Sequence, residues 1–179
     1  MNNDKQLIYE RFLAVTENTR QNPVIVSDGT KRWYNENGQL HREDGPAIEW
    51  DSGTKAWWIN GERHREDGPA IEYPDGGTVW YVNGRYHRED GPAIEEADGT
   101  KKWYINGNRH REDGPAVEWP DGSKNWYIND KYYRSIPEWT KALFEFKKWT
   151  PEFLASKGKD YDKLVNIYAQ KMINDYEQG

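Results

Sequence analysis

The stretch HREDGPAIE occupies His41 to Glu49 and returns along the chain at a constant interval of 23 residues. It recurs unchanged at His64 to Glu72 and at His87 to Glu95, and with one substitution (HREDGPAVE) at His110 to Glu118. A period between about 20 and 50 residues is the sequence signature of a repeat architecture, in which every copy forms the same structural unit. The middle of the chain is therefore interpreted as an array of stacked units.

Two kinds of turn separate the apolar segments of each copy. The first contains an Asp-Gly pair in most copies, as in ADGT at Ala97 to Thr100, and reads DSGT at Asp51 to Thr54; the second is an Asn-Gly pair such as Asn60-Gly61. Both pairs favour tight hairpins because their residues accept positive φ angles. Pro46 and its equivalents cannot donate a ladder hydrogen bond, so they belong at strand starts. The sequence thus predicts an antiparallel meander of β-hairpins.

The register of the hairpin decides which side chains share a face, because side chains alternate along a strand. A four-residue turn at Asp51 to Thr54 pairs Ile48 with Trp57 and Ala47 with Trp58. Ile48, Trp57 and Ile59 then form the core face with their equivalents in the other copies, namely Ile71, Trp80, Val82, Ile94, Trp103, Ile105, Val117, Trp126 and Ile128. The opposite face carries an aromatic and acidic ladder: Tyr34, Trp58, Tyr81, Tyr104, Tyr127, Glu49, Glu72, Glu95 and Glu118.

The pattern W-Y-x-N-G-x-x-H-R, which begins at Trp80 in one copy, resembles the MORN-repeat-variant proteins of bacteria and large phages. The resemblance covers about Val24 to Tyr133. It implies an antiparallel sheet of short hairpins with an aromatic-lined groove. It also implies protein binding of an antitoxin-like kind in a bacterial or phage setting.

Helices are expected on both sides of the repeats, which makes the predicted fold class α+β. Apolar residues recur near helical spacing in residues 1–21, and Pro23 ends that segment. Residues 22–133 form the hairpin repeats. Residues 134–179 form a C-terminal helical segment that opens with a capping box, Ser135 with Glu138. Two roles remain open for these helices, which can cap the exposed strand edges or bind a partner.

Charge and composition narrow the classes of partner. The net charge is −6, which disfavours nucleic acid and anionic membranes as direct ligands. The mean hydropathy of −1.19 is very low, but 10 Trp and 12 Tyr distinguish the chain from disordered sequences. Cysteine is absent, so neither disulfides nor thiolate metal sites are expected. With no signal peptide or apolar run of spanning length, the expected location is a cytoplasm, bacterial or that of a phage host.

The HRED cluster raises the question of catalysis, with histidine as base and an acid as its orienter. Four near-identical copies are more typical of a structural ladder than of one asymmetric active site. Asp44 is expected to cap its own turn, and Arg42 to bridge carboxylates of its own or the next copy. The metal-ligand spacings of zinc and calcium sites are missing. We therefore expect no catalytic residues, no metal site and no cofactor.

These observations favour a non-catalytic protein-interaction module. The expected role is that of a bacterial or phage inhibitor or antitoxin-like protein that binds a target such as a host defence complex. The aromatic and acidic ladder is the expected binding surface. The main alternative is a small-ligand or carbohydrate binder that uses the same ladder, and the third is an enzyme that uses the HRED clusters. The sequence leaves the oligomeric state open.

Overall fold

A computed structural model describes residues 22–135, 138, 139, 141, 142 and 145 of the chain. The chain divides into two compact units, Met1–Gly107 and Asn108–Gly179. The predicted boundaries after residues 21 and 133 remain predictions. The predicted N-terminal helix lies outside the described residues. Most of the predicted helical segment 134–179 lies outside them too, and only a few residues from Glu138 to Glu145 are described as helical. The described structure supports the hairpin array and not the helices.

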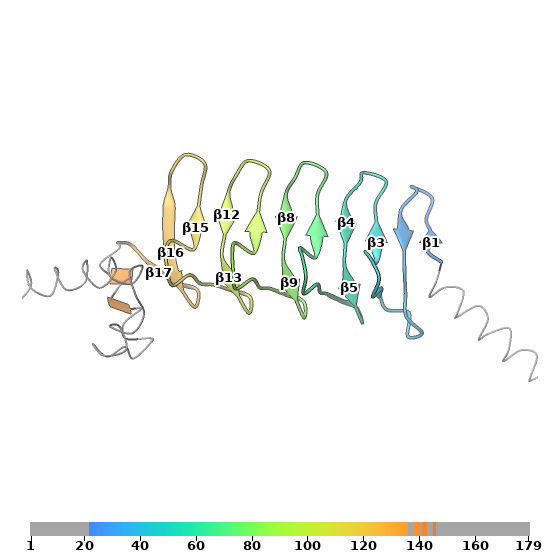
Figure 1. Cartoon of the computed structure of the whole chain (residues 1–179), viewed down its shortest axis with the longest axis horizontal. Helices are drawn as coiled ribbons and strands as arrows, with labels where there is room; N and C mark the ends of the chain where they lie inside the picture. Colours follow the sequence, from blue (N-terminus) through green and yellow to red (C-terminus); the bar gives the residue numbers. More distant parts are fainter. Residues whose placement is uncertain (1–21, 136–137, 140, 143–144, 146–179) are drawn as a thin grey trace, which may run out of the picture. The chain divides into compact units, whose positions relative to one another are not determined.

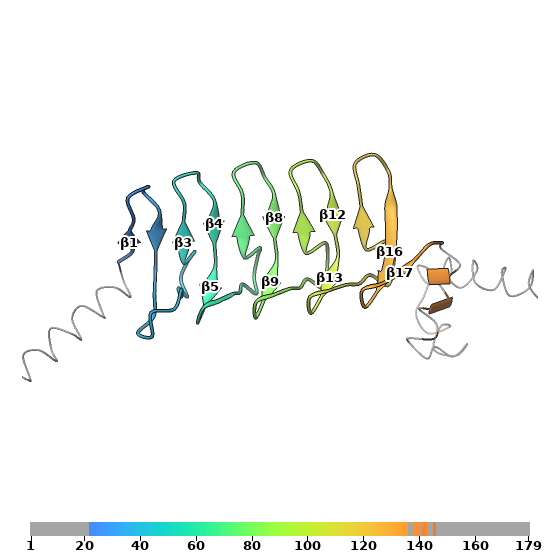
Figure 2. The same ribbon diagram turned by 180° about the vertical axis from the view of Figure 1, so that it is seen from behind.

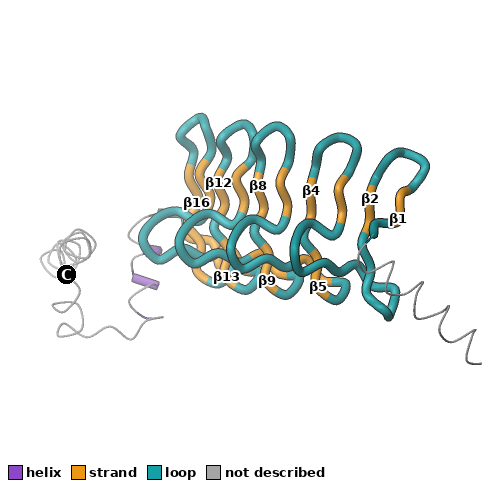
Figure 3. The backbone as a smooth tube through the Cα atoms, turned by 45° about the vertical axis from the view of Figure 1, so that its right-hand side comes forward, coloured by secondary structure: helices purple, strands orange, loops and turns teal. Residues whose placement is uncertain are grey.

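The first unit contains one antiparallel meander (Figures 1 and 2). Its strands lie side by side in the order β1 (Val24–Ile25), β2 (Lys31–Arg32), β3 (Ile48–Glu49), β4 (Lys55–Ala56), β7 (Ile71–Glu72), β8 (Thr78–Val79), β11 (Ile94–Glu95) and β12 (Lys101–Lys102). A second row of short strands belongs to smaller hairpins: β5 (Trp58–Ile59) with β6 (Glu62–Arg63), β9 (Tyr81–Val82) with β10 (Arg85–Tyr86), and β13 (Tyr104–Ile105). Figure 3 shows these two rows as separate strand segments joined by loops.

The second unit also consists of short antiparallel strands. Its strands are β14 (Asn108–Arg109), β15 (Val117–Glu118), β16 (Lys124–Ile128) and β17 (Lys131–Tyr133). Strand β16 pairs antiparallel with β15 along one part and with β17 along another. A small core of Ile128 and Trp139 packs against Trp126 and Tyr133.

Each repeat therefore makes a larger and a smaller hairpin, and the two turns differ in geometry. At the tip of the larger hairpin, Trp50 N donates to Thr54 O (3.0 Å), and Gly53 adopts a φ of +88°. This is a three-residue loop closed by a left-handed glycine. In the smaller hairpin, Asn60 and Gly61 both have positive φ, at 49° and 81°, as a two-residue type I′ turn requires. The positions of both predicted turns are confirmed.

The predicted register is wrong by one residue. Ile48 pairs with Ala56 and not with Trp57, and Glu49 pairs with Lys55. The cause is the left-handed Gly53, which lets the loop close with three residues where four were expected. The same shift recurs in the second unit, where Val117 pairs with Asn125 and not with Trp126.

The core ladder keeps the predicted Ile48, Ile71 and Ile94, but Ala56 and Val79 take the places predicted for tryptophans. It runs across the first unit through Ile48, Ala56, Ile71, Val79 and Ile94, which pair in that order. Trp57 and Trp80 lie on the opposite face, against Arg65 and Arg88, which also bond to Glu72 and Glu95. Ile59, Val82 and Ile105 lie half-buried in the smaller hairpins. Val117 and Ile128 are buried as predicted.

An alanine from each copy of the repeated motif completes the packing. Ala47, Ala70, Ala93 and Ala116 are fully buried, with 0% exposure. The carbonyl of Ala70 accepts from Trp57 N at 2.8 Å, and that of Ala93 accepts from Trp80 N at 2.7 Å. A small side chain is required because each alanine lies directly across the backbone from a tryptophan. The core is thin, so packing of backbone and side chain at these positions is close.

Candidate binding surface: the HREDG joint and the aromatic ladder

The residues His-Arg-Glu-Asp-Gly of each copy form a compact joint between hairpins, here named the HREDG joint. The first unit holds three joints, at residues 41–45, 64–68 and 87–91, and the second unit holds one, at 110–114. Every side chain of the joint has a distinct set of contacts. The second copy, His64 to Gly68, illustrates the pattern.

The arginine makes several contacts at once. Arg65 Nε donates to Asp67 Oδ1 (3.0 Å), and its Nη1 donates to the carbonyl of Pro69 (3.2 Å) and to Glu72 Oε1 (2.9 Å). Its guanidinium carbon lies 4.1 Å from the ring centroid of Trp57, within the range of a cation–π contact. Arg42, Arg88 and Arg111 repeat the bonds to their own aspartate and proline carbonyl. We name this set of contacts the arginine clamp.

The glycine of the joint leaves space for the clamp. A Cβ at Gly68 would lie 2.7 Å from Cζ of Arg65, closer than real Cβ atoms approach another heavy atom. The corresponding distances at Gly45, Gly91 and Gly114 are 3.0, 2.8 and 3.0 Å. The repeated glycine is therefore explained by close approach of a side chain and not by an unusual backbone angle.

The histidine fixes the Asn-Gly turn that follows it. The backbone N–H of Asn83 donates to Nδ1 of His64 at 3.2 Å, and Asn83 is the left-handed residue of its turn. His41 and His87 accept from Asn60 and Asn106 in the same way, both at 3.1 Å. At His64 the same Nδ1 also lies 3.0 Å from the side-chain oxygen of Asn83, and Nε2 faces Glu66 at 3.7 Å. The histidine ring therefore contacts both the backbone and the side chain of the turn asparagine.

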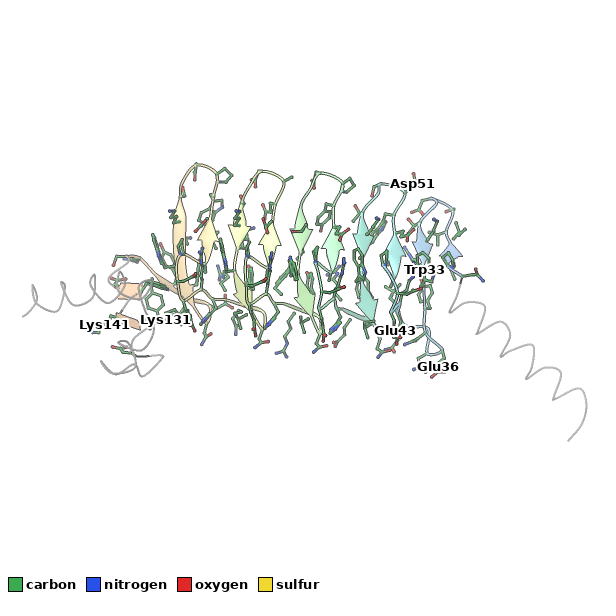
Figure 4. All side chains as sticks on the ribbon, viewed as in Figure 1. Trp33, Glu36, Glu43, Asp51, Lys131 and Lys141 are labelled. Atoms are coloured by element: carbon green, nitrogen blue, oxygen red, sulfur yellow. The ribbon has the colours of Figure 1, made fainter. Side chains whose placement is uncertain are left out.

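The two acids of the joint point into solvent. In the first unit the side chains of Glu43, Asp44, Glu66, Asp67, Glu89 and Asp90 are 80–86% exposed. In the second unit Asp113 is equally exposed, whereas Glu112 is only 30% exposed. We name these residues the acidic pairs. Figure 4 labels Glu43, which lies at the end of the strands remote from the turn at Asp51.

The aspartates are held by the clamp and not mainly by their own turn. Hydrogen bonding from Arg42, reinforced by its charge, holds the pKa of Asp44 below its usual value of 3.8. Arg65 and Arg88 lower the pKa of Asp67 and Asp90 in the same way. The predicted backbone cap at Asp44 is therefore secondary to its bond with the arginine side chain.

The glutamates of the predicted ladder also form ion pairs with the clamp arginines. Glu49, Glu72, Glu95 and Glu118 each lie 2.9–3.6 Å from the clamp arginine of their own copy. The predicted arginine bridge to a carboxylate thus forms within one copy. Lys55 stands between Glu49 and Glu72 on the same face, because it pairs with both residues.

The residues of the predicted aromatic ladder range from half-buried to buried. Tyr81 is 7% exposed, and Tyr34, Trp58 and Tyr104 are half-buried. Arg63 lies over the rings of Trp58 (5.0 Å) and Tyr81 (5.3 Å). In the second unit Tyr127 is also buried, and Arg109 lies 4.1 Å from its ring centroid. The ladder therefore does not form an open apolar stripe.

A second set of ring contacts completes this packing. Tyr86 lies against Tyr81 (4.5 Å between centroids) and against Tyr104 (5.0 Å). Burial, together with the hydrogen bond to Tyr86, raises the pKa of Tyr81. Arg63 and Tyr86 were not among the residues predicted from the sequence. The position immediately before each histidine position could have identified them, because it carries a large side chain in every copy: Leu40, Arg63, Tyr86, Arg109 and Tyr132.

No protein-family model and no curated protein matches the chain. The likeness to MORN-variant repeats thus depends on the residues quoted above. Within the described ranges, the chain has no helix of the length and hydropathy needed to cross a membrane. Among the same residues, no three His, Asp or Glu side chains are grouped so that they could hold a metal ion.

A polar cavity of about 850 Å³ lies beside the first joint. It is lined by Trp33, Asn35, His41 and Glu43, among others, where the smaller hairpin carries one residue more than its equivalents. The Asn35 side chain bonds to Gln39 (3.2 Å) and Asn60 (3.1 Å), and it accepts from two backbone N–H groups. Because these polar atoms already have partners within the chain, the cavity is explained by the longer loop.

Proposed function

We propose that this chain is a non-catalytic protein-binding module that presents its acidic pairs to a basic surface of a target protein. The observation that carries the proposal is the high exposure of Glu43, Glu66 and Glu89 at the same place in successive repeats. The arginine clamp bonds to the neighbouring aspartates, so one carboxylate of each acidic pair is held in position before binding. Such ordering reduces the entropy lost on association.

The spacing of the acidic pairs supports recognition of an extended basic surface. Each repeat of the first unit adds two strands to the sheet. Neighbouring pairs are therefore separated by about 9.5 Å, twice the distance between adjacent strands. Lysine and arginine side chains at a similar interval on a target would meet one pair each. Charge complementarity of this kind mainly increases the association rate and the selectivity for basic partners.

The resemblance to MORN-variant repeats supports the same function. It suggests an inhibitor or antitoxin-like role in a bacterium or phage, with a host defence complex as one class of target. A catalytic role for the joint has less support, because the Nδ1 lone pair of each histidine in the first unit accepts a backbone hydrogen bond. The clamp arginines are likewise engaged by internal partners.

Affinity capture from a bacterial lysate tests the proposal when charge-neutral variants are compared. The double variant Glu66→Gln/Glu89→Gln removes two exposed charges from the joints. The matched control Asp51→Asn/Glu62→Gln removes two exposed charges elsewhere in the same unit. We expect a stoichiometric target to bind the joint variant about 5-fold more weakly than the wild type, and the control nearly as well as the wild type. Equal capture by both variants would refute the proposal, as would the absence of any stoichiometric target.

A further inference from the structure

Asparagine is followed by glycine at four places in the chain: Asn37-Gly38, Asn60-Gly61, Asn83-Gly84 and Asn106-Gly107. This pair favours spontaneous deamidation, because glycine has no side chain to hinder attack of its backbone nitrogen on the asparagine side chain. By sequence alone the four pairs are equivalent. All four asparagines are exposed, so access of solvent does not separate them either. The hydrogen bonds around the pairs differ.

Deamidation of such a pair begins at the backbone nitrogen of the glycine. This nitrogen attacks Cγ of the preceding asparagine, ammonia leaves, and a succinimide ring forms. Water then opens the ring to aspartate or isoaspartate. The nitrogen has to lose its proton and approach Cγ, so a hydrogen bond that holds the N–H on a carbonyl slows the first step. In a folded chain the rate therefore depends on how easily that bond opens.

In the three Asn-Gly turns of the repeats, the glycine N–H bonds to the preceding smaller hairpin. Gly84 N donates to the carbonyl of Arg63 at 2.9 Å, and the same bond recurs in the other two turns at 2.9 and 2.8 Å. The asparagine is held in a similar way, because Asn83 N donates to Nδ1 of His64 at 3.2 Å, with 3.1 Å in the other two turns. Opening any of these turns breaks contacts with another part of the array.

The bonds around Asn37 stay within its own loop. Gly38 N donates to the carbonyl of Asn35 at 3.0 Å, and Asn37 N donates to Oδ1 of Asn35 at 3.0 Å. Figure 4 labels Glu36, which lies between the two asparagines in this loop. An added Cβ at Gly38 would meet no atom within 4 Å apart from its chain neighbours. Residues 36–38 can therefore move without breaking these contacts between hairpins.

We propose that Asn37 is the first of the four Asn-Gly pairs to deamidate in the folded chain, and that contacts between hairpins protect Asn60, Asn83 and Asn106. Isoaspartate adds one carbon to the backbone, which a two-residue turn with both residues at positive φ does not accommodate. The protected pairs are thus those at which the modification would disrupt the array. At Asn37 it adds a negative charge to an exposed loop. This proposal is independent of the proposed protein-binding function.

The test compares the four pairs within one sample. The full chain is incubated in mildly alkaline buffer, digested with trypsin at intervals and analysed by tandem mass spectrometry. The pairs fall in four different tryptic peptides, which are residues 33–42, 56–63, 66–85 and 103–109. We expect Asn37 to convert at least about 10-fold faster than each of the other three asparagines, whose turns open only with the loss of contacts to a second hairpin.

Incubation of the same chain in denaturing urea separates the effect of the fold from that of the flanking residues. Without the folded structure, the four pairs should convert at rates within about 3-fold of one another. If Asn37 keeps its full advantage in urea, the flanking residues set the order and the proposal is overturned. It is equally overturned if Asn37 in the folded chain converts no faster than the other three, or does not convert at all while the pairs convert in urea.

The variant His64→Ala tests the protection by the joint. It removes the acceptor of the Asn83 N–H and leaves the equivalent bond of Asn106 in place. Asn83 should then convert several-fold faster than in the wild type, whereas the rates at Asn37 and Asn106 should not change. An unchanged rate at Asn83 in a folded His64→Ala chain would contradict the protective role of the joint. If the variant unfolds, Asn106 accelerates as well, and the comparison within the wild type decides.

Discussion

His64 and Asn83 are 19 residues apart in the chain, yet the backbone N–H of Asn83 donates to Nδ1 of His64 at 3.2 Å. This bond connects one HREDG joint to the Asn-Gly turn of the next hairpin. It recurs one repeat earlier and one repeat later within the first unit. The histidines that suggested catalysis thus act as acceptors that hold left-handed asparagines in place.

Removing one of these histidines should lower stability without a special effect on binding. His87→Ala leaves the N–H of Asn106 without its acceptor and removes a largely buried ring. We expect a loss of about 1–2 kcal/mol in the free energy of unfolding, measured by urea denaturation. His87→Asn should recover part of this loss, since the amide oxygen can accept near the position of Nδ1. A loss of target binding in a fully stable His87→Ala variant would contradict the structural role.

A side chain at the glycine of the joint should displace the clamp arginine and lower stability. Gly68→Ala places a Cβ 2.7 Å from Cζ of Arg65, which must then give up its bonds to Asp67 and Pro69. The expected cost is about 1–3 kcal/mol in unfolding free energy, from chemical denaturation. Gly77→Ala is the control, because its nearest contact is longer, at 3.2 Å. Equal stability of the two variants would show that the clamp adapts freely.

Acid should weaken the joints in a defined pH window. The folded-state pKa of Asp44, Asp67 and Asp90 lies below the ordinary value of 3.8, chiefly because each carboxylate accepts from its clamp arginine. Their contribution is therefore complete above the unfolded-state pKa and is lost as the pH falls through the lower folded-state value. Thermal unfolding followed against pH should show the aspartate contribution as a decline in melting temperature below about pH 3.8.

The variant Asp67→Asn provides the control for this pH dependence. It should be less stable than the wild type at neutral pH and should show a shallower acid decline, because one titrating group is gone. A melting temperature that falls mainly between about pH 5 and 7 would point to other groups.

The residue that precedes each histidine should be exchangeable between the two types found in the array. Arg63 and Tyr86 occupy equivalent positions, and both pack on the ring of Tyr81. Arg63→Tyr should therefore change the free energy of unfolding by less than about 1 kcal/mol. Arg63→Ala should cost about 1–2 kcal/mol and increase the solvent exposure of Trp58, measured by fluorescence quenching with acrylamide. Equal losses in both variants would show that the ring contact contributes nothing.

The repeat period and the turn residues were enough to predict the hairpin array and both turns. The register was not predictable from the same residues, because DSGT can close as a four-residue or a three-residue loop. The positive φ of Gly53 decides between them. Because Gly53 closes the loop with three residues, Trp57 lies on the face of the glutamates and not on the predicted core face. There the ring of Trp57 packs against the guanidinium of Arg65.

The candidate site was predictable only in part. The sequence indicated a structural role for HRED and an arginine bridge to a carboxylate, and the clamp supports both. It offered no means of seeing that Glu72 would be the partner of Arg65, or that Arg63 would cover Trp58. Those contacts bring together residues from different hairpins or different strands, and alternation within one strand does not report them.

The salt dependence of target binding tests the central claim most directly. Affinities of the wild type and of Glu66→Gln/Glu89→Gln for the captured target are measured by calorimetry from low ionic strength to about 1 M salt, where the Debye length is about 3 Å. If the acidic pairs bind a basic surface, the wild type binds about 5-fold more tightly at low salt and the difference disappears at high salt. Equal affinities of the two proteins at low salt would contradict the account.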